Sequence, residues 1–377
     1  MNKSVANKKK KDCCGCNACA EICPKHCIEM KEDKKGFFYP SVNSGLCVGC
    51  GLCVNVCPFE KEHDEYNYPI TAYAAWNTDR NTYLRSSSGG AAFVFSKFIL
   101  ENNGVVYGCS SNGLDISHIR IDNIDELYRL QGSKYVQSDI RGIFSQIKID
   151  LKKSISVLFI GTPCQVLGLK NYIKHVPENL YLIDLICHGV PSQQMLQEHF
   201  AYVLKSHSVV HLSFRKGQIF CIELKGKDGI IYSSESHKDL YYRAFLNGIS
   251  YRASCYQCPF ASLKRVSDMT IGDFWGLQDV TSFPLKNDEG VSLLLPLSEK
   301  GKMLIEVVKP NMYIYERSLK EATNDNEQLH HPVKETLRVR LFRVLYPILS
   351  FDKVVTICIA GYKFRSFLKI ISRKIFK

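Results

Sequence analysis

The spacing of apolar residues along the chain changes near residue 70. Before that point, apolar side chains stand singly or in pairs between cysteines, glycines and prolines, and only residues 36–40 read as a short strand ending at a turn. Beyond it, apolar runs of strand length alternate with stretches of helical spacing. Strands are predicted at 72–76, 105–109, 118–121, 155–160, 180–186, 268–276 and 291–297, with further β-structure at 209–232. Helices are predicted from about 93 to 102 and at 124–130, 165–173, 192–204 and 300–308. This alternation predicts an α/β fold class, or α+β for the chain as a whole.

Residues 155–186 carry the clearest order of elements. A buried-type strand at 155–160 is followed by a helix at 165–173 and a second buried-type strand at 180–186. A unit of this length predicts two parallel strands joined by a right-handed crossover. The strands break at Cys164 and Cys187, and the carboxyl ends of parallel strands share one edge of the sheet, where α/β proteins bind ligands. We therefore expect the two cysteines to converge.

The chain divides into four segments by composition. Residues 1–62 hold the most closely spaced cysteines, and a polar linker at 60–69 leads to a first strand-rich segment, 70–150. A second strand-rich segment covers 151–320, and residues 321–377 form a basic amphipathic tail. A length of 377 residues leaves enough chain for several domains with cores of their own.

The first segment contains one cysteine pattern twice, with a repeat of 34 residues. Its first copy is Cys13, Cys16, Cys19 and Cys23 before Pro24, and its second copy is Cys47, Cys50, Cys53 and Cys57 before Pro58. A C-x2-C-x2-C-x3-C-P run is typical of bacterial two-cluster ferredoxins, in which three cysteines hold one [4Fe-4S] cluster and the fourth ligates the other. The first cluster would take Cys13, Cys16, Cys19 and Cys57. The second would take Cys47, Cys50, Cys53 and Cys23. We predict a ferredoxin-like module.

Two other interpretations of these cysteines are weaker. A disulfide framework suits short secreted domains, whereas residues 1–11 are polar and lysine-rich and do not predict a signal peptide. Zinc sites rarely use two full copies of a four-cysteine run with a trailing proline. Seventeen cysteines instead predict thiolate ligands kept reduced in an anaerobic or well-protected cytoplasm.

Four further cysteines are dispersed over the segment 151–320. Cys255 and Cys258 form a C-x-x-C pair, and with Cys164 and Cys187 they give four thiolates, enough for a third [4Fe-4S] cluster. Alternatively, Cys164 and Cys187 are packed core thiols, or the C-x-x-C pair binds zinc or forms a redox disulfide. In a chain that already carries clusters, we favour the third cluster. The remaining cysteines are interpreted as non-ligands: Cys14, Cys27, Cys109, Cys221 and Cys358.

Two short loops could bind a phosphate-bearing cofactor. The first is a Ser/Gly loop before the helix predicted from about residue 93, whose free N–H groups and positive dipole end suit a phosphate or pyrophosphate. Its serines could equally serve only to cap that helix. In the second loop Lys134 could pair with a phosphate or flavin oxygen, although an exposed lysine is the commoner outcome. The other loop residues are Ser87, Ser88, Gly89, Gly90, Gly132 and Ser133. Phe274 and Trp275 could line a flavin or substrate pocket or belong to the core.

The net charge of +12 is unevenly distributed. Residues 334–377 contain eleven Lys and Arg against two acidic residues, residues 8–11 add a short basic arm, and the rest is nearly neutral. This distribution argues against a nucleic-acid-binding domain. Charges and Pro347 interrupt any apolar run in the tail long enough to cross a bilayer. The tail therefore predicts either a helix on an anionic membrane surface or a helix packed on the body or on a partner subunit. We expect a cytoplasmic protein, with peripheral contact at the inner membrane face left open.

Six motifs of the chain resemble a known family. They are SSGGAAF at 87–93, GSKYVQS at 132–138, GTPC at 161–164, CHGVPS at 187–192, CYQCPF at 255–260 and DMTIGDFWG at 268–276. Residues 12 to about 320 resemble the beta subunit of coenzyme F420-reducing hydrogenases and formate dehydrogenases, with an N-terminal ferredoxin module. The resemblance implies an FAD in the central domain and a cluster held by Cys164, Cys187, Cys255 and Cys258. It also implies hydride exchange between clusters and a deazaflavin through the flavin.

Two hypotheses for the function follow. The first is an iron–sulfur flavoprotein oxidoreductase that passes electrons from a ferredoxin-like donor through [4Fe-4S] clusters to FAD and on to an organic acceptor. The resemblance extends to bacterial members associated with surface-polysaccharide synthesis. The second is an electron-transfer subunit of a larger oxidoreductase complex, without a substrate of its own. No catalytic residue is assigned. His188, next to Cys187, is a candidate acid, although a hydrogen bond that supports the ligand is the commoner role.

Overall fold

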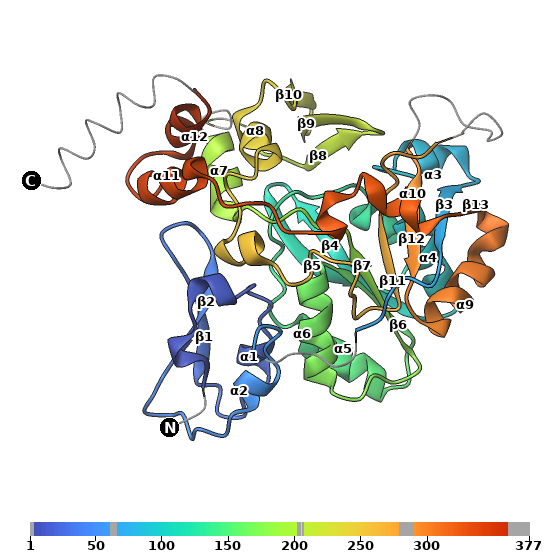
Figure 1. Ribbon diagram of the computed structural model, residues 1–377, viewed down its shortest axis with the longest axis horizontal. Coiled ribbons are helices and arrows are strands. Elements are labelled where there is room, and N and C mark those ends of the chain that lie inside the picture. Colours follow the sequence, from blue (N-terminus) through green and yellow to red (C-terminus); the bar gives the residue numbers. More distant parts are fainter. Residues whose placement is uncertain (1–3, 61–65, 202–204, 206, 279–289, 361–377) are drawn as a thin grey trace, which may run out of the picture.

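The computed structural model describes residues 4–60, 66–201, 205, 207–278 and 290–360. A small cysteine-rich module lies to one side of a larger body built around a sheet (Figure 1). The last described helices, α11 (Leu337–Leu345) and α12 (Phe351–Ile359), lie above the module in this view. The body combines parallel strands, crossover helices and antiparallel strands, so the predicted α/β class is confirmed.

The module shows its sequence repeat in the backbone. Gly15 and Asn17 adopt positive φ ahead of the first one-turn helix, and Gly49 and Gly51 do so ahead of the second. Gly and Asn tolerate this left-handed conformation, so each copy of the repeat can turn its cysteine loop in the same way. The predicted strand at 36–40 is present two residues later. The elements are α1 (Ala18–Glu21), β1 (Ile28–Glu32), β2 (Phe38–Val42) and α2 (Leu52–Asn55), with β1 and β2 antiparallel.

An eight-stranded sheet forms the centre of the body, in the order β13-β3-β12-β11-β7-β6-β4-β5. Strands β4, β6, β7 and β11 are parallel neighbours, and the other pairs are antiparallel. The predicted parallel pair is confirmed as β6 and β7. The predicted segments 70–150 and 151–320 both contribute strands to this one sheet. The strands are β3 (Ala72–Asn77), β4 (Val105–Asn112), β5 (Asp115–Ile121), β6 (Val157–Gly161), β7 (Leu180–Leu185), β11 (Met269–Asp273), β12 (Ser292–Pro296) and β13 (Met312–Arg317).

Helices cover both faces of the sheet. On one face α4 (Ala91–Glu101) and α9 (Glu299–Val308) bury side chains such as Phe95 and Ile305 in a common core with β4, β6 and β12. On the other face α5 (Ile143–Lys152) and α6 (Pro163–Ile173) bury Phe144 and Leu167 against β4, β6 and β7. Burial of such side chains contributes roughly 1.5–3 kcal/mol each. Residues 124–130 form a 3-10 helix, and short helices occupy α3 (Arg80–Leu84) and α10 (Leu319–Asn324).

A second layer above the sheet carries the C-terminal helices. Val339 and Phe342 of α11 and Val354 of α12 are buried in a core shared with α7 (Gln193–Ala201) and α8 (Leu240–Leu246). The alternative in which the tail packs on the body therefore holds for these two helices, and the basic stretch 361–377 lies outside the described residues. No described helix is long and apolar enough to cross a membrane. The layer also contains α7 (Gln193–Ala201), β8 (His211–Lys216), β9 (Ile219–Gly226), β10 (Gly229–Glu235) and α8 (Leu240–Leu246).

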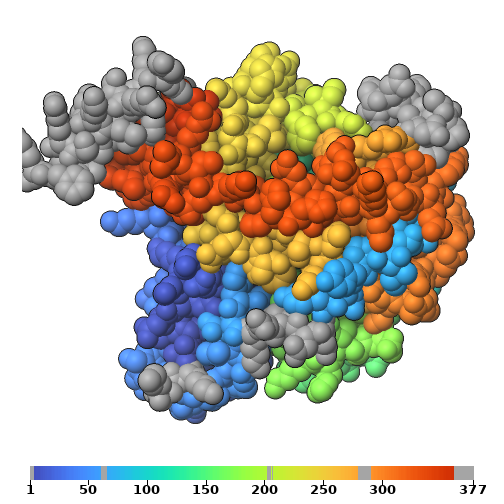
Figure 2. All heavy atoms as spheres, viewed as in Figure 1, coloured from blue at the N-terminus to red at the C-terminus, as the bar shows by residue number. Residues whose placement is uncertain are grey.

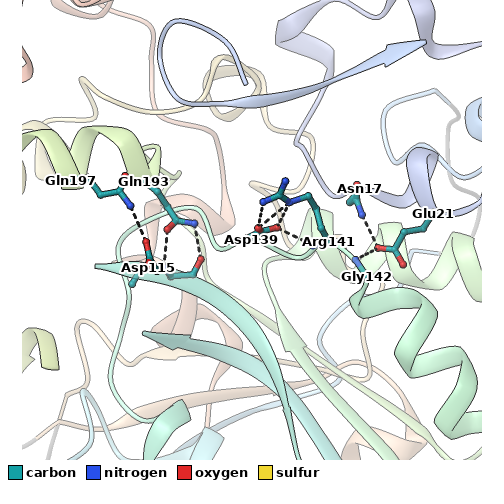
Figure 3. Close-up of polar contacts among 9 residues, drawn as sticks. Asn17, Glu21, Asp115, Asp139, Arg141, Gly142, Gln193 and Gln197 are labelled. Carbon is teal, nitrogen blue, oxygen red and sulfur yellow. Dashed lines mark hydrogen bonds and ion pairs between the residues drawn. The ribbon is translucent and has the colours of Figure 1, made fainter. Parts of the chain in front are cut away.

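The module is joined to the body by a specific polar contact (Figure 3). Glu21 of α1 accepts hydrogen bonds from the backbone N–H groups of Gly142 at 3.0 Å and Ser145 at 2.8 Å. These N–H groups belong to the first turn of α5, so a carboxylate of the module caps a helix of the body. Asn17 donates to the same carboxylate at 2.8 Å. The contact connects the helix that carries Cys19 to the N-terminus of α5.

Candidate functional site

The first predicted cluster quartet lies where the module meets the body. Burial raises the pKa of the Cys19 thiol, and the neighbouring Cys13 and Cys57 raise it further. Cys57 also interacts with Lys8, whose Nζ donates to Glu60 at 2.6 Å and is almost wholly buried. A raised pKa favours the neutral thiol, so a bound cluster would have to hold these sulfurs as thiolates, with the Lys8 ammonium beside them to balance part of the charge.

The second predicted quartet lines a small pocket within the module. Cys23, Cys47, Cys50 and Cys53 all face this pocket, and Cys50 is exposed to solvent. Cys27, which lies outside the repeated spacing, faces it too, with its Sγ 3.4 Å from that of Cys23. The neighbours of this quartet come from the module itself.

The third predicted quartet lines a cavity of about 630 Å³ in the body. Cys164 lies in the first turn of α6, after β6, and Cys187 follows β7. Both line the cavity and interact with each other, so the predicted convergence of the two strand ends is confirmed. Burial, together with neighbouring thiols, raises the pKa of Cys187 to about 12 and that of Cys258 to about 11. Cys255 interacts with Cys187, Cys258 and Cys164. All 17 cysteines are free thiols, and among the described residues no three His, Cys, Asp or Glu side chains are arranged to hold a single metal ion.

A buried arginine faces the third quartet. Arg265 is 1% exposed, and none of its three guanidinium nitrogens makes a hydrogen bond within the described part of the chain. Its ion pair with Asp184 is long, 3.6 Å, and Asp184 already accepts from Ser267 and Thr270. The guanidinium also interacts with Cys187. A buried cation with unused donors is costly unless an anion accepts from it. Arg265 therefore fits an anionic group bound among these cysteines.

The two predicted phosphate loops line the same cavity. Gly90 is the N-cap of α4 and no side chain caps the helix, so the serines do not take the capping role that the sequence left open. Ser88 donates to the carbonyl of Val291 at 2.8 Å, and Ser87 accepts from the N–H of Ser133 at 2.8 Å. The latter bond joins the two loops. Gly89 stands behind the cavity wall, since a Cβ there would meet the Ala75 carbonyl at 2.0 Å. The first-turn N–H groups of α4 remain available at the cavity.

Lys134 is not exposed. Its Nζ donates to the backbone carbonyls of Cys109, Leu130 and Gln131 at 2.8–3.1 Å, and burial lowers its pKa to about 8. These bonds use all three donors of the ammonium to hold the second loop. A direct contact of Lys134 with a flavin stays a prediction.

The remaining wall combines aromatic and titratable side chains. Trp275 stacks with Phe220, with centroids 6.0 Å apart, and both line the cavity, whereas Phe274 is part of the core. His188 lines the cavity and is exposed to solvent. Pro332 and Val333 of the predicted tail also line it. The tail therefore contributes to the site, which its composition did not indicate.

Comparison with known proteins matches two regions of the chain. Residues 155–322 match the C-terminal domain of the coenzyme F420 hydrogenase/dehydrogenase beta subunit, and residues 12–61 match the 4Fe-4S dicluster domain. Together these regions hold the three cysteine quartets, and both phosphate loops lie between them. The C-terminal part of the chain is thus similar to the coenzyme F420 hydrogenase/dehydrogenase beta subunit, and its N-terminal part to 4Fe-4S dicluster domains.

One curated relative is the coenzyme F420-dependent sulfite reductase of Methanocaldococcus jannaschii, 22% identical over 338 residues. The match covers 84% of this chain and 51% of the relative, so the chain spans about half the length of the curated relative it matches. A solved structure, the F420-reducing [NiFe] hydrogenase complex of Methanosarcina barkeri, aligns over 84% of this chain and 96% of that chain, with 15% identity and a TM-score of 0.47.

The dicluster domain and the beta-subunit domain meet at Cys14 and Arg252. The Cys14 thiol interacts with Cys16 and with Cys164 and lines the cavity, so the first and third quartets are adjacent. Arg252 is fully buried and donates to the Cys13 carbonyl at 2.7 Å, with a nitrogen 3.6 Å from the Cys13 Sγ. Neither residue belongs to a spaced motif, so sequence patterns did not point to them. The only signal was the doubled cysteine at 13 and 14.

Proposed function

We propose that this chain is an iron–sulfur flavoprotein oxidoreductase that takes electrons from a ferredoxin-like donor at the dicluster domain. The electrons would reach FAD in the beta-subunit domain and then an organic acceptor. The observation that carries this proposal is the shared cavity, which brings the third quartet and both phosphate loops together and touches the first quartet through Cys14.

The residues present fit the clusters. Cys13, Cys16, Cys19 and Cys57 would hold the first, Cys23, Cys47, Cys50 and Cys53 the second, and Cys164, Cys187, Cys255 and Cys258 the third. When bound, such clusters carry single electrons and a flavin accepts one or two, which connects one-electron donors to hydride chemistry. Lys8 and Arg252 bring positive charge to the first site, and Arg265 brings it to the third. These cations stabilise the negative charge that thiolate-bound clusters carry.

The residues present also fit an FAD. The first turn of α4 offers N–H groups without a side-chain cap, at the positive end of an 11-residue helix, where a pyrophosphate binds well. A cavity of about 630 Å³ is within the usual range for cofactor sites. Phe220 and Trp275 provide a flat apolar wall suited to a ring system. The flavin assignment, including Ser87, Ser88 and Lys134, is part of the proposal.

A second candidate function is an electron-transfer subunit without a substrate of its own. The curated relative is about twice as long as the matched region, so an equal length of chain accompanies the matched part in that protein. By analogy, this chain would pass electrons to a separate protein. The organic acceptor and the link to surface-polysaccharide synthesis rest on the family resemblance. A reducing cytoplasm suits the free thiols, and membrane contact would fall to residues 361–377.

An anaerobic preparation analysed for iron, sulfide and extracted flavin tests the proposal. We expect about twelve irons and one FAD per chain, as three four-iron clusters require. About eight irons per chain would contradict the third cluster, and the absence of flavin would contradict the assignment as a flavoprotein. Turnover of the loaded protein with reduced ferredoxin and a candidate acceptor then separates the two functions. Oxidation of ferredoxin only after another subunit is added would favour the second.

A further inference from the structure

The second quartet lies at the end of the module that faces away from the body. Cys16 of the first quartet packs with Phe144 and Ile140 of the body, whereas Cys23 and Cys53 pack with module residues such as Val5 and Ile28. The three quartets therefore form a series, in which the second is outermost and the third innermost. Figure 1 shows the module on the flank of the body, with α1 on the side of α6.

The surface over the second quartet is open and apolar. Cys50 is exposed, and the flanking side chains Leu46 and Val48 are 57% and 62% exposed. Two large exposed aliphatic side chains therefore lie close in the sequence to an exposed, predicted cluster ligand. They suit a surface that a partner covers for part of the time.

The rim of this surface carries the positive charge of Lys25. Lys25 lines the same small pocket as Val48 and Cys50, is exposed, and forms no ion pair with any described residue, and His26 beside it in the sequence is exposed too. The acidic residue nearest in the sequence, Glu29, pairs with Lys31 at 3.5 Å. An apolar centre with a positive rim matches a partner that presents an acidic rim around its own redox centre.

We propose that the surface formed by Lys25, His26, Leu46, Val48 and Cys50, the tip face, docks a small acidic one-electron carrier protein. The inference rests on the proposed function, because it needs a cluster at the second quartet. Electrons would cross from the carrier to this quartet, and the carrier would be oxidised by one electron for each electron that the chain gains. A small, transient contact of this kind is typical of electron-transfer pairs. Opposite charges would raise the rate of encounter.

The test compares two reductants on the loaded chain. The first is a reduced small acidic two-[4Fe-4S] ferredoxin, and the second is dithionite, which needs no docking surface. Stopped-flow absorbance follows reduction of the clusters. For the double variant Leu46→Glu, Val48→Glu we expect the second-order rate constant with ferredoxin to fall at least about tenfold, because two acidic side chains repel the acidic rim. Iron content and the rate with dithionite should not change.

Two further variants test the role of charge and the position of the docking surface. Lys25→Glu should slow the ferredoxin reaction and weaken its dependence on salt. Met303→Glu on α9, a matched exposed apolar position at 66% exposure, should leave both rates unchanged. An unchanged rate constant with ferredoxin in the double variant would contradict the proposal that the tip face docks the carrier. The proposal would also fail if dithionite reduced the wild-type chain and ferredoxin did not. It would fail as well if the wild-type chain formed a concentration-dependent dimer that the double variant abolished, because the surface would then bind a second copy of the chain. If the wild-type chain binds only four irons, the proposed function itself fails. This outcome differs from failure of the docking surface alone, in which the iron content stays as expected.

Discussion

Arg252 and Arg265 bring buried positive charge to predicted ligands of two different clusters. Arg252 is held by the carbonyls of Cys13 and Phe38 and lies 4.3 Å from the centre of the Tyr39 ring. Arg265 keeps its donors unused toward the third quartet. A fixed cation stabilises the more negative, reduced state of a nearby cluster. Both arginines should therefore raise reduction potentials.

Arg252→Gln should lower the reduction potential of the first cluster, because the variant loses the charge beside the Cys13 sulfur. An EPR-monitored redox titration of the loaded protein measures this directly. Arg252→Lys keeps the charge and should show a smaller shift. Arg120→Gln, at an ion pair with Asp150 and Asp122, serves as the control and should show none. A fully loaded Arg252→Gln protein with an unaltered potential would contradict the charge argument.

His199 links α7 to the start of α8 and to α12. Burial alone would lower its pKa, but hydrogen bonds to Asp239 at 3.0 Å and Asp352 at 2.6 Å raise it to about 9. A raised folded pKa contributes stability that is fully present below the unfolded value of 6.5 and is lost as pH rises through about 9. His199→Gln should therefore destabilise the protein by about 1–3 kcal/mol at pH 6 and by less at pH 10. Denaturant titrations at the two pH values measure this, with exposed His237→Gln as the control. An equal loss at both pH values would rule out the charged form.

A comparison of the predicted and observed elements shows which features the local sequence could predict. Strands β6 and β7 and the placement of Cys164 and Cys187 followed from two apolar runs that each break at a cysteine, because strand ends are local features. Helix α5 and strand β13 were not predicted, although Ile143, Phe144 and Ile147 of α5 have helical spacing and are buried against the sheet. The roles of Arg252 and Cys14 depend on contacts across more than 100 residues of chain, and no local pattern encodes such contacts. The fold class was therefore predictable, and the junction between the quartets was not.

The cap that Glu21 places on α5 is an element-scale contact that can be tested. Glu21→Gln removes the charge that two backbone N–H groups and the Ser145 hydroxyl share. We expect a loss of about 1–3 kcal/mol in stability, because these are hydrogen bonds to a charged acceptor at a helix N-terminus. Thermal unfolding of the loaded protein measures it. Glu29→Gln, an exposed residue of the same module, should have little effect. Equal melting of the two variants would contradict the capping role.

Across the whole molecule, the cavity is assembled from distant parts of the chain. The loops after β6 and β7, the N-terminus of α4, Cys14 of the module and Val333 of the predicted tail all contribute to its wall. In Figure 2 the residues before α11 run as a continuous band across this face of the molecule. The tail is thus partly a wall of the site, and truncation before residue 330 would open the cavity.

The iron content of single-cysteine variants tests this assembly. Cys255→Ser should lower the iron content from about twelve to about eight per chain, because a third cluster would lose a ligand. Cys14→Ser should retain about twelve, since Cys14 is interpreted as a neighbour of two clusters and not as a ligand. Anaerobic iron and sulfide analysis distinguishes them. A loss of about four irons in Cys14→Ser would identify it as a ligand instead.

Helix α6 contributes a cysteine to the third quartet and contacts the first quartet. Its first turn carries Cys164 of the third quartet. One turn later Gly168 faces Cys16 of the first quartet, so closely that a Cβ would lie 2.9 Å from the Cys16 sulfur. A ferredoxin borrowed from another protein could not replace this module unless its own loop met a helix with a glycine in this position. The same holds for exchange of the body. Engineered chimeras therefore need to carry α6 with the module that it contacts.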